Sequence, residues 1–550
     1  MILAAGAALF VFYSVVSTNG FAGFPLDDAW IHLTFARTLA TTGRFAYGAL
    51  NTATSGSTSP LFTFIEAIIF LVTKNEFAVA LIPSILAYAA SAFLFYLLVR
   101  EFTNLAWAPL AGVVLFLVAP SLLLISNWGM ETSLVIALLL WAMLTYKREA
   151  WTQFAIAMGL AIWARPDTVV LVIAMEIDYL YNRNVAQSKP GAKAILILLT
   201  AVLLYAGFNF VLSGTVLPNT FYAKLAYYKN GNTNFWGQLW VLIAGGGRII
   251  AFILAAGGIA WMFTEKKRGN IVLILYPLGM AFLYHWKLPY LYQDGRYLIP
   301  ILPFILLLAT IGSSGSASWL AKSPSLASIL SITLILVAAI GEFTGLTDAV
   351  DNLSFEDAYI HNLQVETAQW CAKNLPQNAV ITTHDIGALG YYSGRKIVDL
   401  VGLADPEMIR YLDKPGAVSA LRKKGVSYAA LLDNWYEIPN ENTVFVNAPP
   451  VSETMRVYYF TDSTRFTGAK VLSIHKYLYG LLSGEDPSAF EEAMKEAIAA
   501  EPDNALTYTL GGEVLLRMHK VDAAKTAFQK ALMLFPSSAR AMQGLSLCVH

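Results

Sequence analysis

The sequence predicts a polytopic α-helical membrane protein followed by an extracytoplasmic α/β domain and helical repeats. Of its 550 residues, 57% are hydrophobic and only 13% are charged, and the mean hydropathy is +0.55. These values lie outside the usual range for a soluble domain. The formal net charge is zero, so no bulk basic field points to nucleic acid as a partner.

Apolar stretches recur along the first 345 residues, and roughly 20 such residues cross a bilayer. The first stretch could be a signal peptide, but it has no preceding Lys or Arg and no clear cleavage site, so we interpret it as a transmembrane helix. The stretch 60–73 is short, opens with Pro60 and contains Glu66, and we expect it to lie in the membrane interface. About eleven spans are then predicted, some of them short, near 1–17, 77–99, 105–126, 131–146, 151–165, 166–181, 192–213, 238–262, 270–287, 297–312 and 325–344.

The distribution of Lys and Arg orients these spans. The basic clusters fall on one side of the membrane if 60–73 does not cross it, and that side is the cytoplasm by the positive-inside rule. With an odd number of spans the amino terminus is cytoplasmic, and both the loop 18–76 and everything after residue 345 lie outside. We therefore predict a multi-pass protein of the plasma or inner membrane with an extracytoplasmic carboxy-terminal part.

Three regions follow from the composition. Residues 1–345 form the transmembrane domain with its first outer loop at 18–76, and 346–470 alternate strand and helix patterns typical of a small α/β domain. Residues 471–550 repeat themselves, since "AMKEAIAAEP" (493–502) returns 34 residues later as "AFQKALMLFP" (527–536), which is the tetratricopeptide period. These repeats either recruit a protein partner or form a helical cap on the outer domain.

Two adjacent carboxylates, Asp27 and Asp28, stand where the first apolar stretch ends, in hydrophobic and aromatic company. Ionisable residues beside transmembrane helices are functional candidates. The alternative is an amino-terminal cap on the helix "AWIHLTFARTLA", for which one Asp would suffice. Two neighbouring acids repel each other, which favours a role beyond capping.

The segment "LDDAWIHLTFARTLATTGRFAYG" with the following "TSGSTSPLFTFIEAII" resembles the first outer loop of the GT-C glycosyltransferases, which take sugar from a polyprenyl-phosphate donor. It is most similar to bacterial proteins like the mycobacterial arabinofuranosyltransferases, whose loop reads approximately D-D-A-Y-I-S-F-R-Y-A-R and then T-S-P-L-W. This chain has His32 where Ser is common and Leu33-Thr34 where Phe-Arg is common. The positive charge of the loop therefore passes to Arg37 or His32.

Further segments resemble the same family, in order and all on the predicted outer face. They are "NWGMETSL" (127–134), "WARPDTVVLV" (163–172), "LPNTFYAK" (217–224) and "GRYLIPILP" (295–303), and in the soluble part "HDIGALGYYSGRKIVDLVGL" (384–403). The resemblance implies a GT-C fold, a polyprenyl-phosphate sugar donor and a glycan, lipid or protein acceptor.

The implied chemistry needs a base for the acceptor hydroxyl and positive charge near the departing phosphate. Asp27 or Asp28 is the base candidate. The outward cations Lys224, Arg296 and Arg165 could hold phosphate. Arg165 could instead be a turn residue paired with Asp167, and Arg296 an interfacial side chain that reaches to the membrane surface.

Other candidate residues have supporting roles. Glu131 and Asp294 could orient the acceptor or join the Asp pair in a divalent cation site for Mg²⁺ or Mn²⁺; some members of the family use a cation, and the pattern here is no recognisable oxygen cage. Asn219 and Tyr222 are expected to shape the donor pocket. His384 and Asp385 lie at a strand end, where sites are often found, but a hydrogen bond within the loop is the commoner role.

We therefore expect an enzyme that moves a hexosyl or pentosyl group to an acceptor on the outer face with inversion, because the sequence shows no second nucleophile. A transporter or flippase is one alternative, but such folds show two related halves, and no internal symmetry is visible. A membrane scaffold whose repeats recruit envelope partners is another. A scaffold would not need so many spans with acids and cations in their outer loops.

Overall fold

A computed structural model of the chain describes all residues except 183, 185–187, 229–233, 264–270, 290, 292, 294, 322, 413–419, 422, 433–451, 460–470, 478–497, 499–501, 504, 537 and 549–550. The chain divides into two compact units. Unit 1 contains Met1–Gly43, Ser57–Pro218 and Tyr228–Ala358, and unit 2 contains Arg44–Gly56, Asn219–Tyr227 and Tyr359–His550.

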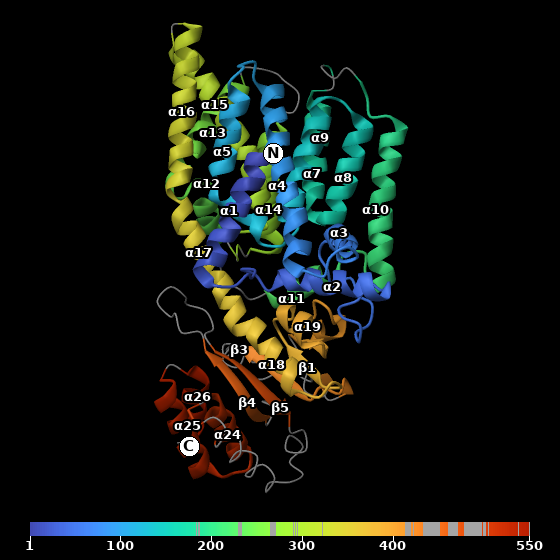
Figure 1. Cartoon of the computed structure of the whole chain (residues 1–550), viewed down its shortest axis with the longest axis vertical. Helices are drawn as coiled ribbons and strands as arrows, with labels where there is room; N and C mark the ends of the chain where they lie inside the picture. The colour runs from blue at the N-terminus through green and yellow to red at the C-terminus, as the bar shows by residue number, and fades with distance from the viewer. Residues whose placement is uncertain are drawn as a thin grey trace. The chain divides into compact units, whose positions relative to one another are not determined.

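Unit 1 is a bundle of helices. In Figure 1 its long helices run side by side, and the short helices α2 and α3 lie at one end of the bundle. The helices are α1 (Ile2–Asn19), α2 (Asp28–Thr42), α3 (Pro60–Phe70), α4 (Glu76–Phe102), α5 (Ala108–Val118), α6 (Pro120–Leu124), η1 (Ile125–Asn127), α7 (Thr132–Lys147), α8 (Trp151–Ala164), η2 (Pro166–Thr168), α9 (Val169–Tyr181), α10 (Ala192–Ser213), α12 (Phe235–Ala244), η3 (Gly246–Arg248), α13 (Ile249–Met262), α14 (Val272–Lys287), η4 (Ile299–Ile301), α15 (Leu302–Leu320), α16 (Pro324–Thr344) and α17 (Leu346–Ile360).

Five helices in the described part of the chain are long and apolar enough to cross a membrane, or up to seven if each of two bent pairs is one span. The sequence predicted about eleven, several of which are shorter helices here, so this number is not confirmed. Two predicted spans are broken instead of continuous. The pair at 108–127 bends by 72° and the pair at 235–262 bends by 73°.

Each break has a local cause. The first falls at Ala119 before Pro120, because the residue before a proline avoids the helical region. The second falls at Gly245, where the backbone is extended before the short helix η3. Non-helical backbone at membrane depth persists only where it is buried in protein or lines a cavity.

Helices α13 and α15 pack unusually closely through glycines. A Cβ added at Gly312 would lie 1.8 Å from the carbonyl oxygen of Leu254, and one added at Gly258 would lie 2.1 Å from that of Leu308. Small residues let backbones in a membrane approach in this way. The close contact holds the middle of α15 against α13.

Helices α2 and α3 form the end of unit 1 that carries the acid pair. Helix α2 begins at Asp28 and ends before Gly43, which has a φ of 70° and closes the helix in the left-handed conformation. Helix α3 has Ser59 as its N-cap, whose hydroxyl accepts the Phe62 amide, and Pro60 in its first turn. Its 11 residues are too few to span a bilayer, in keeping with the predicted interfacial helix.

Unit 2 contains a five-stranded mixed sheet in the order β2-β1-β3-β5-β4. Strand β1 pairs in parallel with β2 and β3, whereas β5 pairs antiparallel with β3 and β4. The strands are β1 (Val380–Thr383), β2 (Lys396–Asp399), β3 (Tyr428–Leu432), β4 (Ser452–Tyr459) and β5 (Val471–Tyr477). The helices of this region are η5 (His361–Val365), α18 (Glu366–Asn374), α19 (Gly387–Ser393) and η6 (Pro406–Tyr411).

The predicted strand, turn, short helix and strand over 379–403 are confirmed as β1, α19 and β2. The expected boundary at 470 cuts the sheet, because β5 begins at Val471 and lies between β3 and β4. The boundary expected at 345 also falls inside a run of helix, since α17 follows directly and unit 1 continues to Ala358.

The carboxy-terminal helices are α24 (Ala505–Arg517), α25 (Val521–Leu534) and α26 (Ala539–Leu547). Ala527 and Ala531 are buried in α25, and Phe528 lies so close to Gly512 and Gly544 that a Cβ there would be 2.7 Å and 2.3 Å from its ring. Small residues thus stand where these helices touch. The first copy of the predicted repeat, 493–502, lies almost wholly outside the described residues, so the tetratricopeptide assignment stays a prediction.

Candidate active site

The acid pair lies at the start of α2. Asp27 is the N-cap residue, but its side chain accepts no capping hydrogen bond, and Asp28 is the first residue of the helix. A cap therefore does not account for Asp27. A negative charge at the position of Asp28 is favoured by the helix dipole.

Asp28 forms an ion pair with a buried arginine. Arg296 Nη1 lies 3.0 Å from Asp28 Oδ2, and Arg296 Nη2 donates to the Tyr297 hydroxyl at 2.8 Å. The Arg296 side chain is 6% exposed, whereas that of Asp28 is 24% exposed. The carboxylate is thus the accessible member of the pair, and Arg296 is not the surface side chain that the alternative interpretation required.

A second pair lies one helical turn further along α2. His32 Nε2 is 3.4 Å from Glu131 Oε2, and both side chains are buried. On its other side His32 Nδ1 is 3.2 Å from the hydroxyl oxygen of Ser57, which lies 2.8 Å from that of Thr63. The imidazole is held from both ring nitrogens, so its orientation is fixed.

Arg165 and Asp167 form the third pair, in the extended turn between α8 and α9. Arg165 donates to both oxygens of Asp167, to the Tyr284 hydroxyl at 3.0 Å and to the Tyr297 carbonyl at 3.2 Å. The Tyr284 hydroxyl in turn donates to Asp167 at 2.7 Å. The predicted pairing of Arg165 with Asp167 is confirmed, and Tyr297 joins it to Arg296.

The three pairs form one cluster, which we call the outer-loop network: Asp28, His32, Glu131, Arg165, Asp167 and Arg296. Four sequence motifs, far apart along the chain, each supply a member. Buried polar groups of this kind persist when they are hydrogen-bonded and paired, and each of these side chains has a charged partner. Arg296 Nε has no hydrogen-bond partner among the described residues. An accessible acid beside buried guanidinium groups can accept a proton and stabilise a departing anion.

Two further predicted residues, Arg37 and Asp294, belong to the sequence of unit 1. Arg37 is half-buried on α2, five residues beyond His32 and so roughly 140° around the helix. Asp294 lies outside the described residues. Among described residues, no group of three or more His, Cys, Asp and Glu side chains is placed to hold a metal ion.

Five predicted residues belong to unit 2. Asn219, Tyr222 and Lys224 lie on α11 (Asn219–Tyr227), where the Asn219 amide donates to the carbonyls of Gly402 and Leu403. This side chain therefore joins α11 to the loop after β2. The backbone amide of Asn219 also donates to the carbonyl and the hydroxyl of Ser55.

His384 and Asp385 stand at the end of β1. Burial lowers the pKa of His384 to about 3, so the imidazole is neutral at physiological pH. Its Nε2 is 3.5 Å from Asp385, which accepts a hydrogen bond from Gln364 at 2.9 Å. The hydrogen bond within the loop that the sequence favoured for His384 stays a prediction, since the hydrogen bond that the structure gives here joins Asp385 to Gln364.

Sequence reasoning missed several residues that hydrogen-bond to the network or to its partners, namely Ser57, Thr63, Met130, Tyr284 and Tyr297. Hydroxyl and thioether side chains in apolar stretches carry little signal of their own. Glu66 was noticed only as an acid in an apolar stretch, and it is completely buried on α3. Its position, one turn after Thr63 on the same helix, could have suggested a place near the site.

Comparisons with known proteins bear on the fold. Residues 355–473 match the model of a domain of unknown function, DUF8728. The structure of ArnT from Cupriavidus metallidurans bound to undecaprenyl phosphate is similar with a TM-score of 0.58 at 12% identity, covering 87% of this chain and 98% of ArnT. The apo form of ArnT gives a TM-score of 0.53 at 14% identity, covering 87% and 97%. None of the curated protein sequences matches.

The arabinofuranosyltransferase AftD from Mycobacteria is also similar, with a TM-score of 0.46 at 15% identity over 86% of this chain and 40% of AftD. The likeness to ArnT shows the fold. The predicted GT-C-like, polytopic helical architecture is therefore confirmed, and the chain is a multi-pass membrane protein.

Proposed function

We propose that this protein is an integral-membrane glycosyltransferase that moves a sugar from a polyprenyl-phosphate donor to an acceptor hydroxyl on the outer face of the plasma or inner membrane. The observation that carries the proposal is the outer-loop network, in which an accessible acid contacts a buried arginine. The GT-C-like fold supports it, since ArnT has this fold and was found with undecaprenyl phosphate bound.

Asp28 is the proposed base. Its carboxylate is the more accessible member of its ion pair, and it can accept the proton of an acceptor hydroxyl. Asp27 directly precedes it and remains the second candidate. An acceptor oxygen that attacks the anomeric carbon in a single displacement inverts its configuration.

Arg296 is the proposed phosphate ligand, with Arg165 behind it. A guanidinium offers paired donors that match a phosphate. If the donor phosphate accepts hydrogen bonds from Arg296, the guanidinium stabilises ionised Asp28 less. The Asp28 carboxylate is then a stronger base than it is without the donor. Donor binding would then activate the base at the moment when it is needed.

His32, Glu131 and Asp167 have positioning roles in this proposal. Glu131 and Ser57 fix the imidazole of His32 one turn from Asp28, and Asp167 holds Arg165.

The test is a transfer assay with purified protein in nanodiscs and radiolabelled polyprenyl-phosphate sugars of the hexose and pentose series. Cleavage should release polyprenyl phosphate and place the label on an acceptor or on water. In sealed vesicles a flippase would move the intact donor across the bilayer without cleaving it. Movement without cleavage, or no cleavage of any donor, would contradict the proposal.

A further inference from the structure

A cavity of about 830 Å³ in unit 1 lies outside the outer-loop network. Small-molecule sites commonly measure roughly 300–1,000 Å³. Both broken helix pairs contribute to its wall. Pro120, Ser121 and Leu124 come from the first pair, and Gly237, Gln238, Val241, Leu242 and Gly245 to Arg248 come from the second. Because irregular backbone at membrane depth is tolerated where it lines a cavity, the two breaks mark this space as a built feature of the fold.

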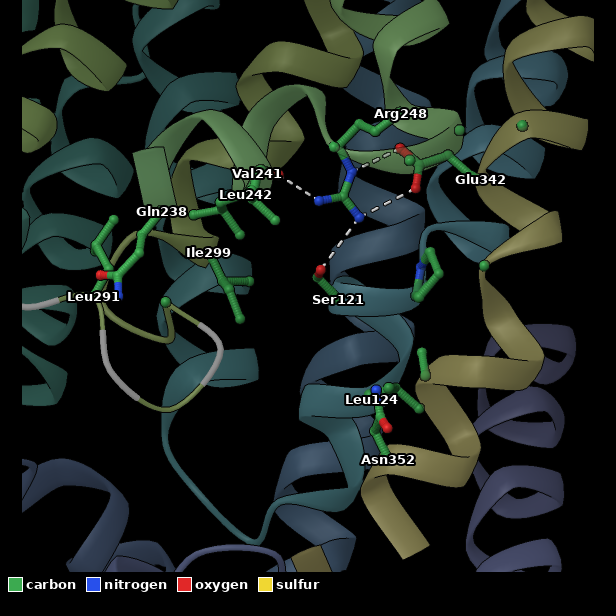
Figure 2. Close-up of a pocket in the computed structure, with 18 of the residues that line it drawn as sticks. Ser121, Leu124, Gln238, Val241, Leu242, Arg248, Leu291, Ile299, Glu342 and Asn352 are labelled. Atoms are coloured by element: carbon green, nitrogen blue, oxygen red, sulfur yellow. Dashed lines mark hydrogen bonds and ion pairs between the residues drawn. The ribbon is translucent and has the colours of Figure 1, made fainter. Parts of the chain in front are cut away.

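One wall of the cavity carries a compensated charge pair. Arg248 donates from Nε to Glu342 Oε1 at 2.9 Å and from Nη2 to Glu342 Oε2 at 3.2 Å, as Figure 2 shows. It also donates to the Ser121 hydroxyl at 3.2 Å and to the Leu242 carbonyl, which the end of α12 leaves without a helical partner. The guanidinium is neutralised by a bidentate carboxylate, which disfavours a phosphate at this wall.

The remaining lining is neutral. Among the lining residues that the structure describes, Arg248 and Glu342 are the only charged ones. Opposite them lie Gln238, Leu291 and Ile299, and Asn352 lies beside Leu124 (Figure 2). The backbone amide of Gln238 donates to the Asn234 carbonyl, but within the described part of the chain its side-chain amide makes no hydrogen bond, so the side chain can serve a ligand.

This mixture distinguishes between possible occupants. A hydrocarbon chain would cover the Arg248, Glu342 and Ser121 polar groups without offering them hydrogen bonds, which is costly. An anionic ligand would meet no uncompensated cation among the described lining residues. A saccharide offers hydroxyl groups to the amides and to the ion pair, and its apolar ring faces can contact Trp128 and Ile299.

The cavity also adjoins the proposed reaction site. Its lining residues Gly295 and Ile299 bracket Arg296 in the sequence, and its lining residue Trp128 is two positions before Met130. The Met130 sulfur lies 3.4 Å from Arg296 Nη1. The same two segments therefore border both the cavity and the outer-loop network.

We infer that this cavity binds an uncharged saccharide portion of the acceptor, so that the acceptor is a neutral glycan or carries one. The identification of this saccharide as part of the acceptor rests on the proposed function, whereas the binding of a saccharide in the cavity does not.

Binding is tested with the full chain in lipid nanodiscs, by saturation-transfer NMR without sugar detergents. The probes are neutral oligosaccharides of the gluco-, manno-, galacto-, arabino- and xylo- series, their uronic-acid counterparts, and farnesol. At least one neutral series should bind. Binding of none of the neutral probes, or of uronic acids or farnesol alone, would overturn the inference.

Two variants locate the binding. Gln238→Ala should weaken it about 2- to 10-fold, the loss of one neutral hydrogen bond, and Ala349→Trp should abolish it by filling the cavity. The matched controls Gln153→Ala on α8 and Ala206→Trp on α10, neither of which lines the cavity, should bind as the unaltered protein does. If Gln238→Ala and Ala349→Trp both bound the saccharide as tightly as the unaltered protein does, the saccharide would lie elsewhere and the inference would be overturned.

Hydrolysis of the donor separates the two proposals. If the protein cleaves a polyprenyl-phosphate sugar in water but binds no neutral saccharide, the inferred acceptor site fails while the proposed function stands. If it binds neutral saccharides in the cavity but cleaves no donor, the proposed function fails and the saccharide site stands.

Discussion

At the residue scale, the central feature is the ion pair of Asp28 with Arg296. Asp28 comes from the first outer loop and Arg296 from the segment before α15, and the two are 268 residues apart in the chain. Arg296 is almost completely enclosed and also contacts Met130 and Tyr297. Its guanidinium is therefore fixed in orientation before any donor arrives.

Replacing Arg296 tests whether this charge serves the donor phosphate. Arg296→Ala should lower kcat/KM for the sugar donor by about 10²- to 10³-fold. This is the range for losing one hydrogen-bonding group that stabilises charge developing in the transition state. Arg296→Lys should retain part of the activity, because it keeps the charge but loses the paired donors. Steady-state kinetics on the donor measure both.

The control is Arg410→Ala, which removes an exposed arginine of unit 2 that pairs with Glu407. It should leave the kinetics unchanged. Full activity of Arg296→Ala would exclude Arg296 as a phosphate ligand.

His384 should make the stability of unit 2 depend on pH. Burial lowers its pKa to about 3 in the folded state, whereas an unfolded histidine titrates near 6.5. The unfolded state then binds an extra proton between these values, so stability is lost as the pH falls from about 6.5 towards 3. Between pH 7.5 and pH 4.5 we expect a loss of about 3 kcal/mol from this residue.

Comparison with His384→Gln isolates that effect, since every other titrating group is shared. One of these is Asp399, whose pKa burial raises to about 7, so it acts in the opposite direction. Chemical unfolding at the two pH values should show a larger loss on acidification for the unaltered protein than for the variant. Parallel losses in both proteins would show that His384 is not held neutral by burial.

At the scale of elements, the two broken helices are the main difference from the sequence prediction. Hydropathy alone makes 105–126 and 238–262 appear continuous, because the average over a window does not register where a helix bends. The signals were local: Pro120 in the first, and three consecutive glycines, Gly245 to Gly247, in the second. Only the structure shows that both breaks line one cavity.

The second break depends on a close contact between glycines. A Cβ at Gly247 would lie 1.7 Å from the carbonyl oxygen of Gly341, so one of the two backbones must move to admit it. Gly247→Ala should destabilise unit 1 by about 1–3 kcal/mol, as overpacking does. Thermal unfolding in nanodiscs measures the change.

The matched control is Gly207→Ala in α10, where an added Cβ meets nothing within 4 Å. This change should be neutral or slightly stabilising, because alanine favours helix over glycine. Equal melting temperatures of Gly247→Ala and Gly207→Ala would contradict the close packing at Gly247.

Much of the proposed site could be predicted from the sequence at this scale. The motifs around Asp28, Glu131, Arg165 and Arg296 were placed on one face by the distribution of basic residues and by family resemblance, and the structure brings them together. Apart from Asp167 beside Arg165, their partners could not be predicted. Contacts such as Arg165 with Tyr284 join residues 119 apart through a single hydrogen bond, which leaves no periodic pattern in either helix.

At the scale of the whole molecule, the division into domains was predicted only in outline. Unit 2 takes in Arg44–Gly56 and Asn219–Tyr227, which the sequence placed in loops of the membrane domain. Single side-chain hydrogen bonds join them to unit 2, such as Asn51 to the Ile397 carbonyl at 2.8 Å and Asn219 to that of Leu403 at 2.8 Å. Such bonds have no signature in composition or hydropathy.

The position of β5 makes the boundary of the repeats testable. Removing 471–550 deletes β5 from between β3 and β4, whereas removing 505–550 leaves every described strand in place. We expect the shorter deletion to keep unit 2 folded and donor cleavage intact, and the longer one to unfold the sheet. Circular dichroism, limited proteolysis and the cleavage assay distinguish the two.

If the repeats recruit a partner, the shorter deletion should lose that partner and keep cleavage. Loss of cleavage by the 505–550 deletion with a folded sheet would show instead that the terminal helices contribute to catalysis.

The most direct test of the account compares two isosteric variants in the transfer assay, Asp28→Asn and Asp27→Asn, with folding checked by thermal unfolding. The structure gives Asp28 the contact with Arg296, so Asp28→Asn should lower transfer by about 10²- to 10⁴-fold, the usual contribution of a general base. Asp27→Asn should reduce it by less than about 10-fold, since the neighbouring charge alters Asp28 only through the electrostatic field. Full transfer by Asp28→Asn, or by a double variant of both residues, would contradict the assignment of a base to this pair.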